Sequence, residues 1–318
     1  MAPALEAVEF DGSSSSLKRV CVMDAGGCLG SSLVYSLLQR GYFVHAAIQS
    51  RVEMESMERR IVDNKNLRVF HTDPMDYQSI VEALEGCFGL FYSFEPQFDQ
   101  PSYDELMAEM EIRAAHNVLE ACAQTDTIDK VVFSSSATAV FWRDPSDSTP
   151  SLGDFDERNW SNVNFCKKFK LWHGLSKTLT EKTAWALAMD RGVSMVSINA
   201  GLLLSPDLTV THPYLKGASE MYKDGVFVTV DLKFLVDSHI CIYEDSSSYG
   251  RYLCFNHVIN SNKDAVNLAQ ILLPADISSL PPSMMVGENK MVPQRISNKK
   301  LNKLMANFEG GATLSATE

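Results

Sequence analysis

Short apolar runs alternate with segments of helical periodicity along the first two thirds of the chain. Runs typical of strands occupy residues 17–23, 42–48, 67–73, 89–94 and 130–136. Between them, apolar residues recur at helical spacing in residues 31–41, 79–87 and 105–124. Strands that alternate with helices imply a parallel sheet covered on both faces. The predicted fold class is therefore α/β, a Rossmann-type doubly wound parallel sheet.

The pattern becomes less regular after about residue 205, where Pro and Ser are more frequent. We predict a flexible N-terminal lead at 1–16, the Rossmann domain at 17–204, and a smaller C-terminal substrate-binding lobe at 205–304, some of whose strands return to the main sheet. Residues 305–318 are predicted to be a flexible tail, because NFEGGATLSATE has too little apolar content to pack firmly. A chain of 318 residues, 45% of them hydrophobic, can bury the large core that this fold needs.

Composition and charge exclude several classes of partner. The formal net charge is -12 and no basic stripe reverses it locally, so nucleic acid is not an expected partner. No apolar run approaches the roughly 18 residues of a membrane span, and the N-terminus lacks the basic segment of a signal peptide. The seven cysteines are scattered without Cys-x-x-Cys, and the seven histidines form no cluster, so we expect no metal site. A cytoplasmic location is expected.

A glycine-rich turn, DAGGCLG at 24–30, connects the first predicted strand to the first helix. In this setting, glycines such as Gly26, Gly27 and Gly30 let the backbone approach a pyrophosphate at a helix N-terminus. Asp24 stands where such a motif usually has its first glycine. The turn therefore predicts an NAD(P)-binding domain, and the alternative is a tight turn that binds no ligand.

The end of the second strand predicts the type of cofactor. An acid at this place binds the ribose hydroxyls of NAD, whereas a basic residue accepts the 2′-phosphate of NADP. Here Gln49 and Ser50 are followed by Arg51, with Arg59 and Arg60 beyond, and no acid ends the strand. This favours NADP, although three arginines on a solvated helix face would look the same.

Three serines and a His/Lys pair are the candidate catalytic groups. Ser136 is the last of three serines at the carboxyl end of a predicted strand, where ligands of open α/β folds bind. His173 and Lys177 lie one turn apart on a helix expected at 172–188, so their side chains share a face. Taken alone, the serines could cap nearby backbone and His173 could be a packed histidine. Together with the glycine turn, they predict a site.

At this point the chain resembles the extended short-chain dehydrogenases/reductases, and within them the plant cinnamoyl-CoA reductase and dihydroflavonol reductase group. The resemblance runs from about residue 17 to 304 and rests on the combination of VCVMDAGGCLGSSLVYSLLQRGY, LRVFHTDPMD, EGCFGLFYSFEP, NVLEACAQ, KVVFSSSATAV, DERNWSNVNFC, SKTLTEKTAWALA, INAGLLLSP and ISNKKL. It implies an NADPH-dependent reductase of an aromatic, phenylpropanoid-like aldehyde or ketone.

The resemblance also implies roles for individual residues. Ser136 would polarise the substrate carbonyl, and Asn117 would support the active-site water chain. Lys177 would bind the nicotinamide ribose, and His173 stands where the family has its tyrosine acid. The implied cofactor-binding residues are Gly26, Gly27, Cys28, Leu29, Gly30, Arg51, Asp73 and Lys177.

A histidine in the tyrosine's place changes the expected chemistry. An imidazolium is a better proton donor than a phenol, but Lys177 one turn away disfavours the charged form, so we expect His173 to be mostly neutral at neutral pH. Around it only Trp172 matches the usual thioester-reductase sequence, which favours a free aromatic aldehyde over a CoA thioester. Slow, pH-sensitive reduction is physically possible.

Three hypotheses remain open. The first is the NADPH-dependent reductase with His173 as the acid. The second is a catalytically silent relative that binds NADP(H) or a metabolite and acts as a regulatory or partner-binding protein. The third is a scaffold that has kept the fold and lost its ligand. Turnover separates the first from the others, and cofactor binding separates the second from the third.

Overall fold

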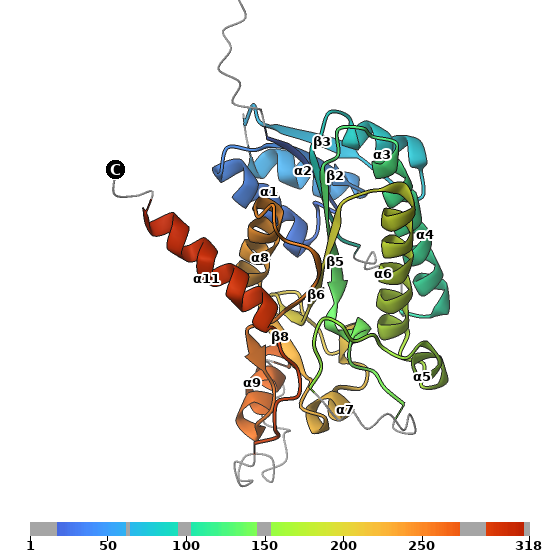
Figure 1. The fold of residues 1–318 in the computed structure, drawn as a ribbon, viewed down its shortest axis with the longest axis vertical. Coiled ribbons are helices and arrows are strands. Elements are labelled where there is room, and N and C mark those ends of the chain that lie inside the picture. Colours follow the sequence, from blue (N-terminus) through green and yellow to red (C-terminus); the bar gives the residue numbers. More distant parts are fainter. Residues whose placement is uncertain (1–17, 62–63, 95–102, 145–153, 274–290, 315–318) are drawn as a thin grey trace, which may run out of the picture.

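A computed structural model describes residues 18–61, 64–94, 103–144, 154–273 and 291–314. The predicted lead at 1–16 lies outside the described residues, as do the last four residues of the predicted tail. The described part forms one large sheet with helices on both faces and a smaller lobe at one end (Figure 1).

Seven parallel strands make the main sheet, in the order β3-β2-β1-β4-β5-β6-β9. They are β1 (Arg19–Met23), β2 (Phe43–Ile48), β3 (Leu67–His71), β4 (Gly89–Tyr92), β5 (Lys130–Ser136), β6 (Met195–Ala200) and β9 (Gly250–Cys254). The order reverses between β1 and β4, which is the point where open α/β sheets bind ligands. The predicted fold class is confirmed, and β9 shows a strand of the 205–304 region lying in the main sheet.

Helices cover the two faces of the sheet because alternate residues of each strand point to opposite sides. One face packs on α1 (Cys28–Gln39), α2 (Arg51–Arg60), α8 (Leu232–Glu244) and α11 (Lys299–Leu314). The other face packs on α3 (Tyr77–Leu84), α4 (Glu105–Ala123) and α6 (Trp172–Arg191). In β1, for example, Val20 and Val22 belong to the first core, and Cys21 and Met23 belong to the second. Helices α4 and α6 lie side by side along the second face (Figure 1).

The smaller lobe has its own apolar core beyond the carboxyl end of the sheet. It contains a three-stranded sheet, β10-β8-β7, made of β7 (Leu202–Leu204), β8 (Val228–Asp231) and β10 (His257–Val258). Around it lie α5 (Val163–Lys168), α7 (Ala218–Lys223), α9 (Asn262–Leu272) and the short 3₁₀ turns η1 (Ala137–Ala139) and η2 (Pro213–Leu215). The lobe therefore stands directly beside the ends of β5 and β6.

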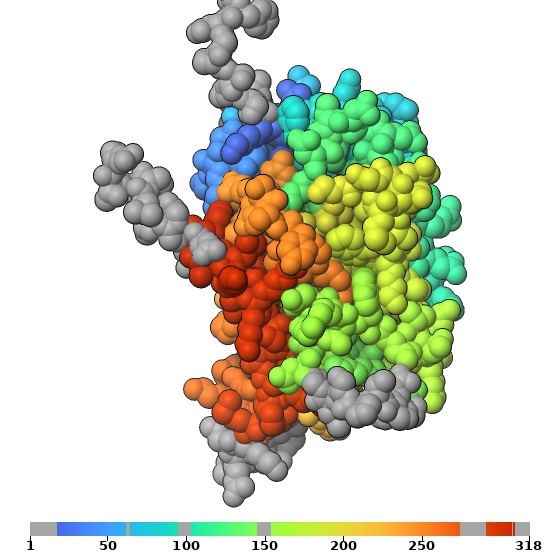
Figure 2. Space-filling model, viewed as in Figure 1, coloured from blue at the N-terminus to red at the C-terminus, as the bar shows by residue number. Residues whose placement is uncertain are grey.

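The flexible tail predicted from residue 305 is wrong at its start, because α11 continues through Leu314. Leu301 and Met305 are buried in the core that includes α8, and Phe308 packs against it. The Arg40 guanidinium lies 5.1 Å from the Phe308 ring centre. Figure 2 shows the red residues at the start of α11 lying against the body of the molecule. The spacing at i, i+4 and i+7 buries one helix face, which outweighs the polar composition of the segment.

Candidate active site

The glycine turn opens onto a cavity of about 500 Å³. Gly26, Gly27, Cys28 and Leu29 line this cavity, and Gly27 is the N-cap residue of α1 with extended backbone. Gly27 has no side chain and therefore does not cap this helix end by hydrogen bonding to it. Such a helix N-terminus has backbone N–H groups and a dipole that suit an anion. The arrangement supports the predicted role of the turn.

Gly30 serves packing, because it is not among the cavity residues. A Cβ there would lie 2.1 Å from the Asp24 backbone oxygen, so only glycine lets α1 approach the turn this closely. Asp24 itself has a φ of 64°, a left-handed conformation that favours glycine and that Asp tolerates better than most residues. This explains why related motifs carry glycine at the position of Asp24.

The three serines at the end of β5 have different surroundings. The Ser134 hydroxyl lies 2.8 Å from His239 Nε2 on α8, whereas the Ser135 hydroxyl donates to Glu181 on α6 at 2.9 Å. Their directions alternate because successive strand residues face opposite sides of the sheet. Ser136, at the end of the strand, faces the cavity. Only Ser134 and Ser136 therefore share the side of the sheet that faces α8.

Ser136 is connected to His173 through Thr138. The Thr138 hydroxyl lies 3.0 Å from the Ser136 hydroxyl oxygen and 3.0 Å from His173 Nδ1. The Thr138 backbone N–H also donates to the Ser136 hydroxyl at 3.2 Å. The pKa of His173 is lowered well below its usual range, first by burial and then by the charges of Lys177 and His212. His173 is therefore neutral at neutral pH, as the sequence predicts.

Lys177 is held by a buried acid that the sequence analysis did not identify. Its ammonium donates to Glu111 Oε1 at 2.6 Å and to the Phe94 carbonyl at 3.3 Å. Glu111 also accepts hydrogen bonds from Ser176, at 2.5 Å, and from Tyr103. The Lys177 side chain is 13% exposed and borders the cavity, and that of Glu111 is 2% exposed. The sequence signal that could have identified Glu111 is its place as an acidic residue among the buried apolar positions of α4.

Three predicted residues lie away from the cavity. The Asn117 side-chain amide donates to the Pro74 carbonyl at 3.0 Å, and the Asp73 carboxylate accepts from the Met75 N–H at 2.8 Å. Both side chains therefore hydrogen-bond to the loop after β3, and the role of Asn117 in an active-site water chain stays a prediction. Arg51 is exposed at the start of α2 and does not line the cavity.

Glu53 brings an acid to the glycine turn. A Cβ placed on Gly26 would lie 2.1 Å from Glu53 Oε2, so this carboxylate lies directly over the turn. An acid that binds the ribose of NAD is expected at the end of the second strand, whereas Glu53 stands in the first turn of the following helix. Its position four residues beyond Gln49 was the reason it was missed.

The far wall of the cavity comes from the lobe. Leu202, Leu203, Leu208 and Tyr214 supply apolar surface, and hydroxyl groups, Asp207 and His212 line the rest. The His173 ring lies near Tyr214 and His212, with ring centres 5.9 and 6.3 Å apart. Burial lowers the pKa of His212 to about 4. This wall can therefore pack a neutral, flat molecule beside His173.

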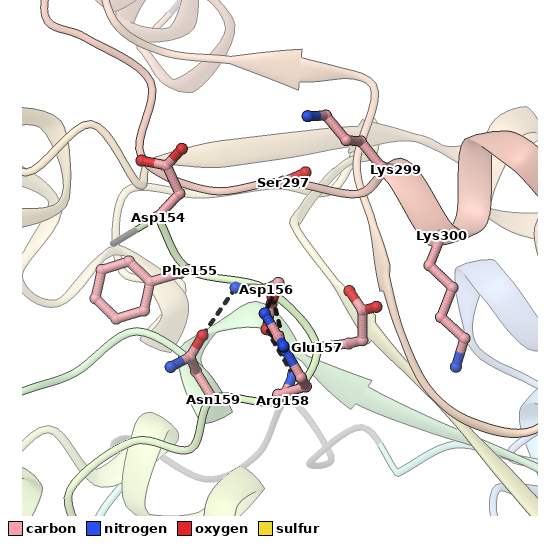
Figure 3. A pocket seen from close by; sticks show the side chains of 9 residues that line it. All are labelled: Asp154, Phe155, Asp156, Glu157, Arg158, Asn159, Ser297, Lys299 and Lys300. Atoms are coloured by element: carbon pink, nitrogen blue, oxygen red, sulfur yellow. Dashed lines mark hydrogen bonds and ion pairs between the residues drawn. The ribbon is translucent and has the colours of Figure 1, made fainter. Parts of the chain in front are cut away.

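A second hollow, of about 670 Å³, lies on the surface between residues 154–159 and the start of α11 (Figure 3). Three of its charged side chains, Asp156, Arg158 and Lys300, are engaged with each other or with backbone. Arg158 pairs with Asp156 at 2.5 Å, and Lys300 donates to the Tyr249 carbonyl at 2.5 Å. It contains none of the residues of the first cavity, so we assign the site to the first cavity.

Among the described residues, no helix is long and apolar enough to cross a membrane. No group of three or more His, Cys, Asp or Glu residues in this part of the chain could hold a metal ion.

Comparison with known proteins places the chain among reductases. Residues 16–157 match the NmrA-like family. The chain is 33% identical over 300 residues to cinnamoyl-CoA reductase 1 of Petunia hybrida, which covers 91% of this chain and 87% of that protein. This chain belongs to the cinnamoyl-CoA reductase and dihydroflavonol reductase family. A dihydroflavonol 4-reductase of Gerbera hybrida is 32% identical over 256 residues, covering 75% of this chain and 68% of that one.

Solved structures agree with the family's fold. Vestitone reductase from alfalfa matches with a TM-score of 0.67 at 24% identity and covers 90% of this chain and 91% of its own. The yeast methylglyoxal/isovaleraldehyde reductase Gre2, complexed with NADPH, matches with a TM-score of 0.69 at 16% identity and covers 91% and 93%. The resemblance predicted from the sequence motifs, to the cinnamoyl-CoA reductase and dihydroflavonol reductase group, is confirmed by the relatives named above.

Proposed function

We propose that this chain is an NADPH-dependent reductase of an aromatic, phenylpropanoid-like aldehyde or ketone. One observation carries the proposal: Ser136, His173 and Lys177 line the same cavity as the glycine turn at the N-terminus of α1. A carbonyl reductase needs a cofactor site, a carbonyl-polarising group and a proton source in one place. The family, whose named members above are reductases, supports the same reaction class.

The residues present fit NADPH, which would supply the hydride. Gly26 and Gly27 leave the end of α1 open to a pyrophosphate. Lys177 uses two donors on Glu111 and Phe94, and an ammonium has three, so one remains for a ribose hydroxyl. Arg51 is available for a 2′-phosphate. The Glu53 carboxylate must move from Gly26, and its exposed, flexible side chain permits this.

The cavity favours an uncharged aromatic substrate. Lys177 is the only lysine or arginine among the described residues that line it, and that charge is paired with Glu111. A CoA thioester brings phosphates that need cations, whereas Asp207 and Glu53 add negative charge. Leu202, Leu203 and Tyr214 instead offer apolar surface for a ring. We therefore propose that hydroxycinnamaldehydes and similar carbonyls are preferred over CoA thioesters.

Titration with NADPH and NADH, followed by a panel of aldehydes and their CoA thioesters, tests this function. We expect tighter binding of NADPH and oxidation of NADPH with an aromatic aldehyde. Lys177→Met should weaken both, and Lys167→Met, an exposed lysine on α5, is the matched control. Rapid reduction of feruloyl-CoA without aldehyde turnover would contradict the substrate class. Absence of NADPH binding would contradict the function itself.

A catalytically silent NADP(H)-binding relative is the second candidate. Two observations favour it. His173 is neutral, and a neutral imidazole cannot give up a proton as readily as an imidazolium. The charge of Lys177 is already paired with Glu111. This second candidate predicts that the protein binds NADPH but reduces no carbonyl compound in the panel. His173→Tyr separates the two candidates: a silent protein that gains activity has a dormant site, whereas an active protein that only changes its pH profile uses the histidine.

A further inference from the structure

A neutral histidine cannot simply give up a proton, because the product would be an imidazolate. The ring can, however, release a proton from one nitrogen while it accepts a proton at the other. This requires a hydrogen-bonded path from the releasing nitrogen to the substrate. Thr138 provides such a path, since its hydroxyl lies between His173 Nδ1 and the Ser136 hydroxyl.

The three groups have two matched arrangements of hydrogens. In the first, Nδ1–H of His173 donates to Thr138, Thr138 donates to Ser136, and the Ser136 proton is directed into the cavity. In the second, every hydrogen bond is reversed and Nε2 carries the proton. The structure has Thr138 as donor to Ser136, which is the first arrangement. The Thr138 N–H donates to the Ser136 oxygen as well and holds that hydroxyl beside Thr138 in either arrangement.

We propose that Thr138 is the central member of a proton relay, through which Ser136 protonates the substrate oxygen while His173 is recharged from solvent at Nε2. This inference rests on the proposed reductase function. When the substrate oxygen takes the Ser136 proton, the Thr138 proton moves to Ser136 and the Nδ1 proton moves to Thr138. The proton that the reduction consumes comes from bulk solvent and enters at Nε2, so Ser136, Thr138 and His173 all end neutral. After product release, water returns a proton at Ser136 and accepts one at Nε2.

The relay is rigidly held. Thr138 is 1% exposed and lies in η1, directly after β5. Its backbone carbonyl accepts a hydrogen bond from Ser161 at 2.8 Å. A Cβ on Gly174 would lie 3.2 Å from the same carbonyl oxygen, so the first turn of α6 packs closely on η1. This close approach sets the distance between Thr138 and His173.

The surroundings of His173 keep the ring neutral. Lys177 on the same helix and His212 before η2 both oppose a positive charge on the ring. Tyr103, before α4, lies with its ring centre 5.5 Å from that of His173 and has a pKa raised well above its ordinary value by burial and Glu111. Tyr214 of η2 is also neutral, because burial raises its pKa. We therefore expect turnover to be nearly independent of pH between about 6 and 8, because burial keeps His173, His212, Tyr103 and Tyr214 neutral there.

The tautomer of His173 tests the relay without any need for turnover. In the full-length wild type, ¹⁵N NMR of the imidazole, assigned with His173→Gln, should show the proton on Nδ1. Thr138→Val removes the acceptor, so the proton should move to Nε2, whereas Thr138→Ser should keep it on Nδ1. A wild-type ring with its proton on Nε2 at rest, or a ring unchanged by Thr138→Val, would overturn the relay even if Thr138→Val folded poorly.

Kinetics supply the second readout. Thr138→Val should lower kcat by roughly 100-fold with NADPH affinity unchanged, and Thr138→Ser should restore most of it. Several protons move together, so the dependence of kcat on the D₂O fraction should curve in the wild type. Equal kcat in Thr138→Val and wild type would overturn the relay. A wild type with the Nδ1 tautomer but no turnover would instead contradict the proposed function.

Discussion

Helix α6 carries two buried ion pairs one turn apart, and they are built in different ways. Lys177 pairs with Glu111 at 2.6 Å, and Glu181 pairs with Arg251 at 2.8 Å. The first pair lies at the edge of the cavity. The second lies between the sheet and α6, where Glu181 accepts a hydrogen bond from Ser135. The two pairs allow a direct comparison between a lysine that we propose acts in the reaction and an ion pair that holds the fold together.

The Glu181–Arg251 pair is closed. Glu181 is fully buried and accepts from Ser135, Ser197, Asn199 and Arg251. Arg251 Nη1 donates to the Glu157 and Asn159 carbonyls, at 2.9 and 2.5 Å. The network ties β5, β6, β9 and α6 together, and loss of either ion-pair member leaves a buried charge without its partner. Within the described residues, the gap in this network is Asn199 Oδ1, which is buried without a hydrogen-bond partner.

The Lys177–Glu111 pair is open on one side. Glu111 is fully engaged, but Lys177 borders the cavity with a donor to spare. The difference teaches that burial of a charge alone does not identify a functional group. What distinguishes Lys177 is an unused donor directed at a space that a ligand can fill.

Breaking the closed pair should have the largest effect. Glu181→Gln leaves the Arg251 charge buried without a counter-charge, and we expect the free energy of unfolding to fall by about 3–5 kcal/mol. Denaturant unfolding measures this, and the double variant Glu181→Met/Arg251→Met should recover much of the loss. A loss below about 1 kcal/mol would mean that the network is hydrated and the comparison fails.

On the opposite face of the sheet, acid should destabilise the fold through His239 of α8, which contacts Ser134. Burial lowers the pKa of this histidine to about 4, while an unfolded histidine has a pKa near 6.5. The folded pKa is the lower one, so its contribution is complete above about pH 6.5 and is lost as pH falls toward 4, in total about 3 kcal/mol. Unfolding measured between pH 7 and 4 should show this loss, reduced in His239→Gln. Equal slopes in both proteins would refute the assignment.

Glu111→Gln tests the open pair. We expect a smaller loss of stability than in Glu181→Gln, about 1–3 kcal/mol, because Lys177 can find water or a ligand in the cavity. NADPH should bind several-fold more tightly, since Lys177 then carries an uncompensated charge beside an anionic cofactor. Unfolding and cofactor titration measure the two quantities. If Glu111→Gln loses as much stability as Glu181→Gln, the two pairs are of one kind.

The smallest effects should come from the exposed charges of α2. Arg51→Ala should weaken NADPH binding by about two- to five-fold and leave NADH binding unchanged, because only NADPH has the 2′-phosphate. Glu53→Gln should strengthen the binding of both cofactors, since the carboxylate lies over Gly26. Titrations at low and high salt check this, because exposed charges are screened. Arg51→Ala affecting both cofactors equally would exclude it from the 2′-phosphate site.

Much of the fold followed from local patterns. The strand and helix periods at residues 17–136 predicted the parallel sheet, since each period depends only on neighbouring residues. The same local patterns placed the candidate catalytic residues at one edge of the sheet. Ser136 ends a strand, and His173 and Lys177 lie one turn apart on a helix. The end of the chain was the exception, because the apolar face of α11 becomes visible as a helix only once α8 provides a surface for it.

The sequence by itself determined the layered α/β fold, the glycine turn and the pair on α6, because period and turn chemistry are encoded within a few residues of each other. Only the tertiary structure decided which groups meet: Glu111 with Lys177, Glu53 with Gly26, Thr138 with His173, and Asn117 with the loop after β3. Such contacts join elements that are far apart in the chain, and their distances depend on how the helices pack on the sheet. The neutral state of His173 depends on sequence and on tertiary structure. Burial and the proximity of His212 come from the fold, whereas Lys177 is a near neighbour in the sequence.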